Sequence, residues 1–149
     1  MVKYEATIQS QHSIRKVFDY LSNFCSAEQW DPGVIKVTQA QGSSSDLGAT
    51  YDVVAKFGIS KVPLKYEITK FKPPYEIEFI ANAPNFVARD VMKFRENDAG
   101  SVVEYHAELK FHGFWRLLSP VMQLIFNRVG DKAAAGLDDC LNSKELVRI

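Results

Sequence analysis

The chain has few residues of the kinds that build metal centres and disulfide frameworks. Its 149 residues include two cysteines, Cys25 and Cys140, and three histidines, His12, His106 and His112. No two of these stand at the short spacings typical of zinc ligands, so the sequence predicts no metal site. The cysteines are far apart in predicted helical segments. We interpret them as reduced core thiols, and a disulfide between them is the alternative.

The sequence also lacks an excess of charge of either sign. Eighteen Lys and Arg residues balance eighteen Asp and Glu residues. A protein that binds nucleic acid normally needs a basic excess to displace counterions, and an anionic membrane surface attracts basic clusters. We therefore expect neither nucleic acid nor an anionic membrane surface as a partner.

Long apolar runs are absent as well. The most apolar segment, residues 114–141, is interrupted by Arg116, Arg128 and Asp131, and it falls short of the roughly 18 continuous apolar residues of a membrane span. Residues 1–5 lack the apolar core of a signal peptide. The sequence predicts a cytoplasmic protein without integral membrane association.

Two common catalytic loop motifs are missing. There is no Gly-x-Ser-x-Gly nucleophile elbow. The segment Gly-Ser-Ser-Ser-Asp-Leu-Gly at residues 42–48 has neither the lysine nor the spacing of a phosphate-binding loop. We interpret it as a flexible hairpin connection.

The strongest pattern lies in the last third of the chain. Apolar residues recur every three or four positions from Phe114 to Leu141, which predicts a long amphipathic helix. Because Pro120 is tolerated in a first turn, the helix either begins at Ser119 after a short turn or runs unbroken from Phe114. We expect its apolar stripe, including Ile125 and Val129, to be buried against a sheet.

The rest of the chain reads mostly as strands. Period-two alternation and turn residues predict seven of them, at residues 2–8, 34–40, 49–57, 62–71, 75–81, 86–94 and 102–111. Ser13 and Asn23 bracket a short helix, and a second helical turn follows at residues 24–29. Helices and strands in separate blocks predict an α+β fold with an antiparallel sheet, and no linker divides residues 1–149 into more than one domain.

Four segments carry a resemblance to a known superfamily. They are Val17-Phe18-Asp19-Tyr20-Leu21-Ser22, Trp30-Asp31-Pro32-Gly33-Val34, Phe71-Lys72-Pro73-Pro74-Tyr75-Glu76-Ile77-Glu78-Phe79, and Gly130 to Leu141. Together they resemble the START-like, Bet v 1-like or SRPBCC superfamily, and within it the bacterial polyketide cyclase/dehydrase and lipid-transport proteins. The resemblance implies a helix-grip fold, in which a curved seven-stranded antiparallel sheet wraps a long C-terminal helix and encloses an apolar cavity.

Strand alternation predicts which side chains face that helix. The inward face mixes large aromatic residues with Ala55, Ala81, Ala88 and Ala107. These small residues either leave room for an apolar ligand or are covered by the aromatic rings. Trp115 and Met122, at the start of the helix, are either a gate to the cavity or a hydrophobic hinge. The candidate ligand-binding residues are Tyr51, Phe57, Tyr66, Phe79, Asp90, Met92, Tyr105, Trp115 and Met122.

Asp90 is the one charged residue on the predicted inward face. A buried carboxylate is costly unless it is hydrogen-bonded, and Tyr51, Tyr66 or Tyr105 could donate that bond. If Asp90 faces the cavity, burial should raise its pKa. The alternative is a β-bulge that turns Asp90 outward beside Arg89. No catalytic residue is assigned, and Asp90 is the only candidate.

We therefore predict that the protein binds or transports a hydrophobic small molecule, with lipids and polyketide-like aromatics as the classes that the resemblance implies. An alternative is a polyketide cyclase or dehydratase without metal or other cofactor, in which Asp90 acts as acid or base with Tyr66 or Tyr105. A third is a protein-interaction module without a ligand. The chain is expected to be a monomer or a homodimer.

Overall fold

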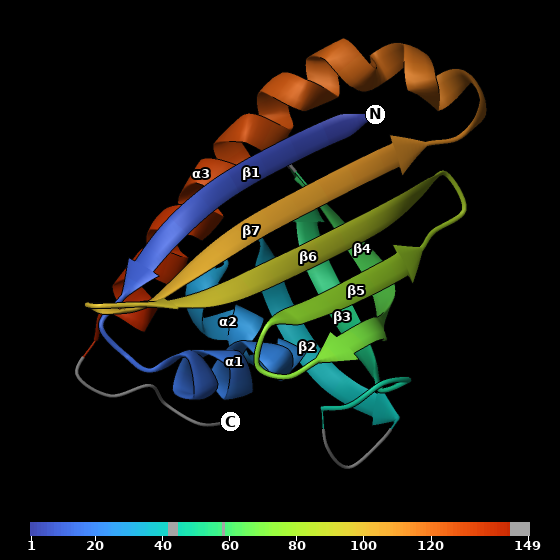
Figure 1. The fold of residues 1–149 in the computed structure, drawn as a ribbon. Coiled ribbons are helices and arrows are strands. Elements are labelled where there is room, and N and C mark those ends of the chain that lie inside the picture. The colour runs from blue at the N-terminus through green and yellow to red at the C-terminus, as the bar shows by residue number, and fades with distance from the viewer. Residues whose placement is uncertain (42–44, 58, 144–149) are drawn as a thin grey trace.

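A curved antiparallel sheet forms the centre of the molecule (Figure 1). The computed structural model describes residues 1–41, 45–57 and 59–143, and of Phe57 only the backbone. Seven strands follow the order β1-β7-β6-β5-β4-β3-β2. They are β1 (Val2–Ser10), β2 (Val34–Gln41), β3 (Thr50–Phe57), β4 (Ser60–Lys72), β5 (Glu76–Asn82), β6 (Phe86–Asn97) and β7 (Gly100–Phe111). The predicted strands are confirmed, with ends shifted by a few residues.

Short helices after β1 cover one end of the sheet. They are α1 (Ile14–Ser22), the 3-10 helix η1 (Phe24–Ser26) and α2 (Ala27–Trp30). The Ser13 hydroxyl caps α1 by accepting the backbone N–H of Lys16 at 3.2 Å. The Asn23 side chain, at the C-cap of α1, accepts the N–H of Cys25 at 3.0 Å and so starts η1. Both predicted boundary residues therefore act as caps.

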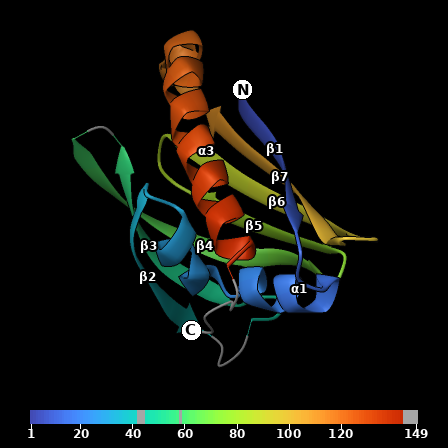
Figure 2. The same cartoon turned by 90° about the vertical axis from the view of Figure 1, so that its left-hand side faces the viewer.

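The C-terminal helix crosses the concave side of the sheet (Figure 2). The 3-10 helix η2 (Gly113–Leu118) leads into α3 (Ser119–Leu141), so the helix proper begins at Ser119. Gln123 ties it to β1 by accepting the Lys3 N–H at 3.0 Å and donating to the Lys3 carbonyl at 2.7 Å. A Cβ at Gly136 would lie 2.0 Å from the carbonyl oxygen of Trp30, so only glycine permits α2 and α3 to pack this closely.

The first half of α3 differs from the sequence prediction. Leu124 and Ile125 of α3 are 69% and 41% exposed, and Leu117 of the preceding η2 is 81% exposed. The buried residues of α3 all lie in its second half, at Gly130, Ala133, Leu137 and Leu141. The first turn of α3 extends past the start of β1 (Figure 2), and Leu124 and Ile125, which follow the contact between Gln123 and Lys3, lie on a side of the helix that the sheet does not cover. The prediction that Ile125 is buried is therefore wrong, and Val129 is half-buried.

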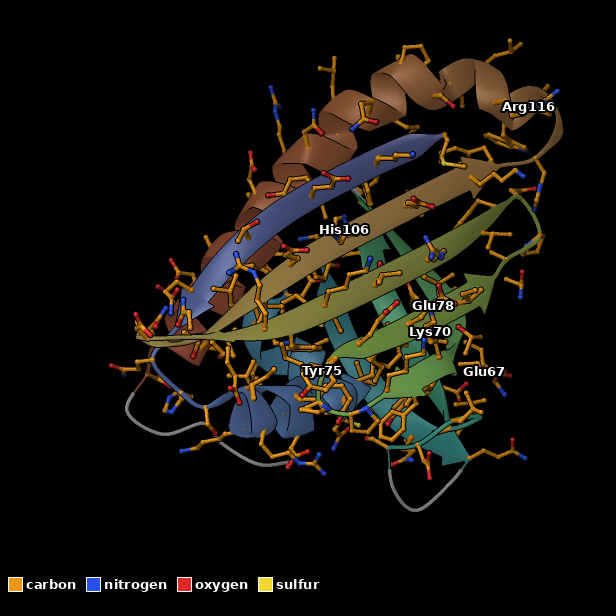
Figure 3. The ribbon with its side chains drawn as sticks, in the orientation of Figure 1. Glu67, Lys70, Tyr75, Glu78, His106 and Arg116 are labelled. Atoms are coloured by element: carbon orange, nitrogen blue, oxygen red, sulfur yellow. The ribbon has the colours of Figure 1, made fainter. Side chains whose placement is uncertain are left out.

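The outer face of the sheet is covered with charged side chains (Figure 3). Arg89 Nε lies 2.7 Å from Glu78 Oε2, and His106 Nδ1 lies 3.4 Å from Glu5 Oε1. Strand β6 pairs with β5 and β7 without a register shift. Because Arg89 faces outward, its neighbour Asp90 faces the concave side, and the bulge considered as an alternative does not occur.

The two cysteines do not form a disulfide. Cys25 and Cys140 are both half-buried free thiols. Within residues 1–41, 45–57 and 59–143, none of the helices has both the length and the hydropathy that crossing a bilayer would require.

Candidate ligand-binding cavity

A cavity of about 100 Å³ lies between the concave face of the sheet and the middle of α3. Phe126, Val129, Gly130 and Ala133 of α3 form its roof. Its walls are mostly apolar and include Phe24, Val53, Ala55, Leu64, Phe86, Ala88, Ala107 and Leu109. Pockets for drug-sized ligands usually measure about 300–1,000 Å³, so this cavity fits a small group or one end of a larger ligand.

Three acidic residues border this largely apolar space, at Asp31, Asp90 and Glu108. The Glu108 carboxylate pairs with the outward Arg89 at 3.6 Å, which leaves two carboxyls, from different elements, to face the cavity. Asp90 stands on β6, between Phe79 of β5 and Ala107 of β7. Asp31 follows α2, in the turn that leads to β2, and its Oδ1 accepts the N–H of Gly33 at 2.8 Å. In the sequence, Asp31 stands in the segment Trp30-Asp31-Pro32-Gly33-Val34, which carried no prediction of a functional role for it. Its approach to Asp90 depends on how α2 packs.

Three tyrosines share the cavity with these carboxyls. Tyr66 reaches it from β4, Tyr105 from β7 and Tyr4 from β1. The ring of Phe24 stacks on Tyr66 with centroids 4.8 Å apart, and Trp30 meets Tyr105 edge-on at 5.9 Å. These contacts hold the two phenol rings in place. The Tyr4 hydroxyl is already engaged, because it donates to Asp131 Oδ1 of α3 at 2.8 Å.

The surroundings of Asp90 change its titration. Burial raises the pKa of Asp90 to about 7, and the negative charge of Asp31 adds to the rise. Burial also raises the pKa of Asp31, although the Gly33 N–H opposes this. The pKa values of Tyr66 and Tyr105 are raised by burial and by the nearby carboxylates, so both phenols stay protonated. The cavity therefore holds a carboxyl that can gain or lose a proton near neutral pH.

No hydrogen bond from the described residues reaches the Asp90 carboxyl, although polar groups surround it. The residue as a whole is half-buried, since the cavity leaves part of its surface accessible. The sequence offered Tyr51, Tyr66 and Tyr105 as donors to this carboxyl, and none of the three donates a hydrogen bond to it. An enclosed carboxyl without a donor is available to a ligand.

Three of the other candidate residues lie in the core beside the cavity. Tyr51, Phe79 and Met92 are almost fully buried and do not line the space. Phe24 of η1, which does line the cavity, contacts both of the first two, with its ring 6.0 Å from that of Tyr51 and 4.7 Å from that of Phe79. The Tyr51 hydroxyl and the Ser45 hydroxyl are hydrogen-bonded at 2.8 Å.

The remaining candidates lie toward the other end of the molecule. Trp115 is 37% exposed in η2 and stacks on Phe114 with centroids 4.9 Å apart. Met122 is half-buried against the core. Neither of them lines the cavity. The side chain of Phe57 lies outside the described residues.

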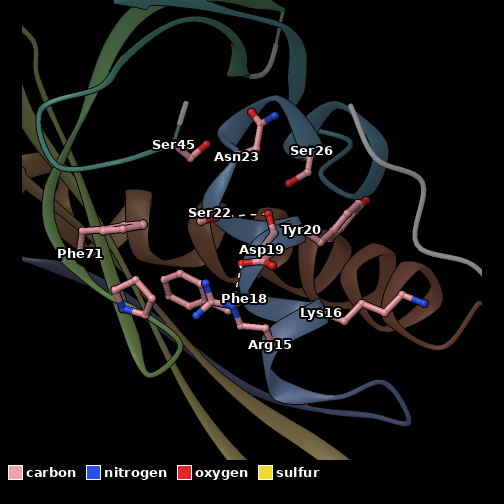
Figure 4. A pocket seen from close by; sticks show the side chains of 11 residues that line it. Arg15, Lys16, Phe18, Asp19, Tyr20, Ser22, Asn23, Ser26, Ser45 and Phe71 are labelled. Carbon is pink, nitrogen blue, oxygen red and sulfur yellow. Dashed lines mark hydrogen bonds and ion pairs between the residues drawn. The ribbon is translucent and has the colours of Figure 1, made fainter. Parts of the chain in front are cut away.

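A second hollow lies beside α1 (Figure 4). Its volume is about 430 Å³, larger than that of the cavity under α3. Its charged residues Arg15, Lys16 and Asp19 are exposed, and Arg15 Nε pairs with Asp19 Oδ1 at 3.5 Å. We assign the candidate site to the cavity under α3, because its lining is mostly apolar and charges act on a ligand more strongly in such surroundings than among exposed polar side chains.

Comparisons with known proteins agree with this architecture. The family model described as polyketide cyclase / dehydrase and lipid transport matches residues 1–140. The chain belongs to this family. A comparison with curated proteins gives no significant match. Membership confirms the resemblance seen in the sequence and supports a ligand-binding or cyclase role.

Solved structures show the same fold at low sequence identity. TTHA0849 from Thermus thermophilus has a TM-score of 0.74 at 15% identity, covering 93% of this chain and 94% of that one. A START superfamily protein from Mycobacterium smegmatis has a TM-score of 0.74 at 8% identity, covering 94% and 95%. The di-domain ARO/CYC BexL, from the BE-7585A biosynthetic pathway, has a TM-score of 0.73 at 11% identity. This chain is covered to 96% in that match but spans only 50% of BexL. The helix-grip fold is thus confirmed.

Proposed function

We propose that the protein binds a hydrophobic small molecule, lipid or polyketide-like, with its polar end at Asp90 in the cavity under α3. The observation that carries the proposal is the cavity itself, an accessible space with apolar walls around a carboxyl that lacks a donor among the described residues. No buried side-chain oxygen or nitrogen of the described residues lacks a partner, so the Asp90 oxygens are accessible to solvent, and a ligand's polar group would take the place of that water.

The small volume decides how such a ligand would sit. A cavity of about 100 Å³ encloses the polar end, and the apolar remainder would extend past the rim. Val62 and Leu64 of β4 and Phe126 of α3 line the cavity and are half-buried, so part of each side chain is also in contact with solvent. These side chains offer an apolar path between the cavity and solvent, which is what a lipid or polyketide tail requires.

Ala107→Leu tests whether the cavity is the binding site. We expect a neutral, fluorescent naphthalene probe to bind the wild-type protein with micromolar Kd, about −8 kcal/mol. The leucine side chain would occupy the space next to Asp90 and weaken binding at least tenfold. A fluorescence titration measures both. Ala135→Leu, on the exposed side of α3, is the matched control and should bind the probe as the wild type does.

Equal binding by both variants would place the probe elsewhere, for instance on the exposed half of α3, and would remove the basis of the proposal. If Ala107→Leu fails to fold, Ala88→Val narrows the same cavity with a smaller change in volume.

A second candidate function is a cyclase or dehydratase reaction, and the titration of Asp90 favours it. A general base works best with a pKa near the working pH, and that of Asp90 is about 7. Ionised Asp90 would take a proton from a carbon next to a ketone. The electron pair would move into an enolate, and the Tyr66 or Tyr105 hydroxyl would hydrogen-bond its oxygen. The enolate carbon can then attack a second carbonyl and close a ring, and the alkoxide that forms takes back the proton held by Asp90.

Asp90→Asn separates this reaction from simple binding. The amide keeps the shape of the side chain but cannot accept the proton, so turnover of a poly-β-ketone substrate should fall about 100-fold or more. Affinity for the neutral probe should stay within about tenfold, or ~1.4 kcal/mol. The assay follows ring formation by absorbance. Unchanged turnover in Asp90→Asn would show that Asp90 is not the base.

A further inference from the structure

We propose that the polar end of the ligand is a cation, an amine or a quaternary ammonium group, held between Asp31 and Asp90 against the tyrosine rings of the cavity. The inference rests on the proposed function and names the class of ligand that the cavity takes.

The charges around the cavity favour a cation. Asp31 and Asp90 both line it, and Lys56 is the only basic residue among the described residues that do. Lys56 is exposed at the rim, next in sequence to the inward Ala55, so strand alternation directs its ammonium group away from the interior. The two carboxyls therefore share a mostly apolar space into which no cationic side chain of the described residues points.

The aromatic lining points the same way. Tyr4, Tyr66, Tyr105, Phe24, Phe86 and Phe126 all border the space. Ring faces attract ammonium groups within about 6 Å, and this attraction grows when water is excluded. A cavity that combines ring faces with carboxylates suits an ammonium group. The same carboxylates would repel the carboxylate of a fatty acid or a phosphate group.

Cation binding would be linked to the proton on Asp90. The groups that face this carboxyl are Asp31 from the turn after α2, Tyr66 from β4 and Tyr105 from β7. Farther away, Tyr4 of β1 is bonded to Asp131 of α3, and Lys56 of β3 stands at the rim. A cation stabilises the ionised carboxylate, so affinity should rise with pH as Asp90 loses its proton. A neutral ligand that accepts a hydrogen bond from protonated Asp90 would show the opposite trend.

Choline and 3,3-dimethylbutan-1-ol form a matched pair of probes, because they share a shape and differ in charge. We expect choline to bind at least tenfold more tightly than the alcohol at pH 8, measured by calorimetric or NMR titration. With the pKa of Asp90 at about 7, the ionised fraction and hence choline affinity should fall about tenfold between pH 8 and pH 6. Asp90→Asn should remove this pH dependence and lower the affinity for choline at least tenfold, without lowering the affinity for the alcohol.

Asp52→Asn is the charge-matched control. Asp52 is exposed on β3 and pairs with Lys65 at 3.8 Å, so its loss should leave choline binding unchanged. Asp31→Asn keeps the oxygen that accepts the Gly33 N–H and should weaken choline as Asp90→Asn does.

The outcomes separate this inference from the proposed function. If the naphthalene probe binds in a way that Ala107→Leu blocks, but choline binds no better than the alcohol, the cation is excluded and the cavity remains a binding site. Tighter alcohol binding at low pH would assign a neutral acceptor to Asp90 instead. Failure of both choline and the naphthalene probe to bind would overturn the proposed function and the cation together.

Discussion

Leu137→Ala should lower the free energy of unfolding by about 3 kcal/mol, whereas Leu124→Ala on the same helix should change it by less than ~0.5 kcal/mol. Both residues belong to α3, where the side chain of Leu137 is 1% exposed and that of Leu124 is 69% exposed. The two substitutions change helix propensity equally, so the difference between them reports burial alone. Urea unfolding followed by circular dichroism measures both values.

The pair of variants also tests the exposed half of α3. If Leu124→Ala costs as much as Leu137→Ala, the first half of the helix must be covered in solution. A second copy of the chain is one way to cover it, and sedimentation analysis would show that dimer. Equal costs without a dimer would contradict the position of α3 in the structure.

Much of the fold was predictable because it depends on local periodicity. In β7, alternate residues from Val103 to Leu109 are buried, and the intervening Glu104, His106 and Glu108 are less so. This period-two pattern is a direct consequence of the pleat, so it can be found without the rest of the chain. The caps at Ser13 and Asn23 are local as well.

The extent of burial along α3 could not be predicted in the same way. The apolar period indicates which side of a helix seeks a partner, but not where the partner ends. Ile125 follows the contact between Gln123 and Lys3 of β1 and is still 41% exposed, whereas Leu137 on the same helix is 1% exposed. Only the assembled strands determine that limit.

The cavity was predictable in part. Asp90 stood out because it is the only charge on an apolar strand face. Tyr66 and Tyr51 share an inward face, yet only Tyr66 lines the cavity, and Phe24 from another element contacts both rings. Asp31 was missed since its bond to Gly33 is that of an ordinary turn, and its role depends on tertiary packing.

Asp90→Asn is expected to stabilise the free protein at pH 8, by roughly 2–4 kcal/mol. The pKa of Asp90 is about 7 in the folded state, against an ordinary value of 3.8. The folded protein therefore binds the proton more tightly than the unfolded chain does. Wild-type stability from this group is fully present below about pH 4 and is lost as pH rises to about 7. The amide does not titrate, so this position of the variant contributes no change in the free energy of unfolding over that pH range.

The difference in unfolding free energy between variant and wild type should thus be small at pH 4, grow up to pH 7 and stay constant above it. Urea unfolding across this range measures the difference, and titrating groups that do not interact with Asp90 cancel because both proteins carry them. Asp52→Asn, which removes an exposed carboxylate, should show no such trend. A destabilised Asp90→Asn at pH 8 would mean that the carboxylate is satisfied within the protein. It would then have no bond to offer, and the role of Asp90 in holding a ligand would be lost. A stabilised variant would show that the free protein keeps an unfavourable charge in its cavity, which a bound ligand can offset.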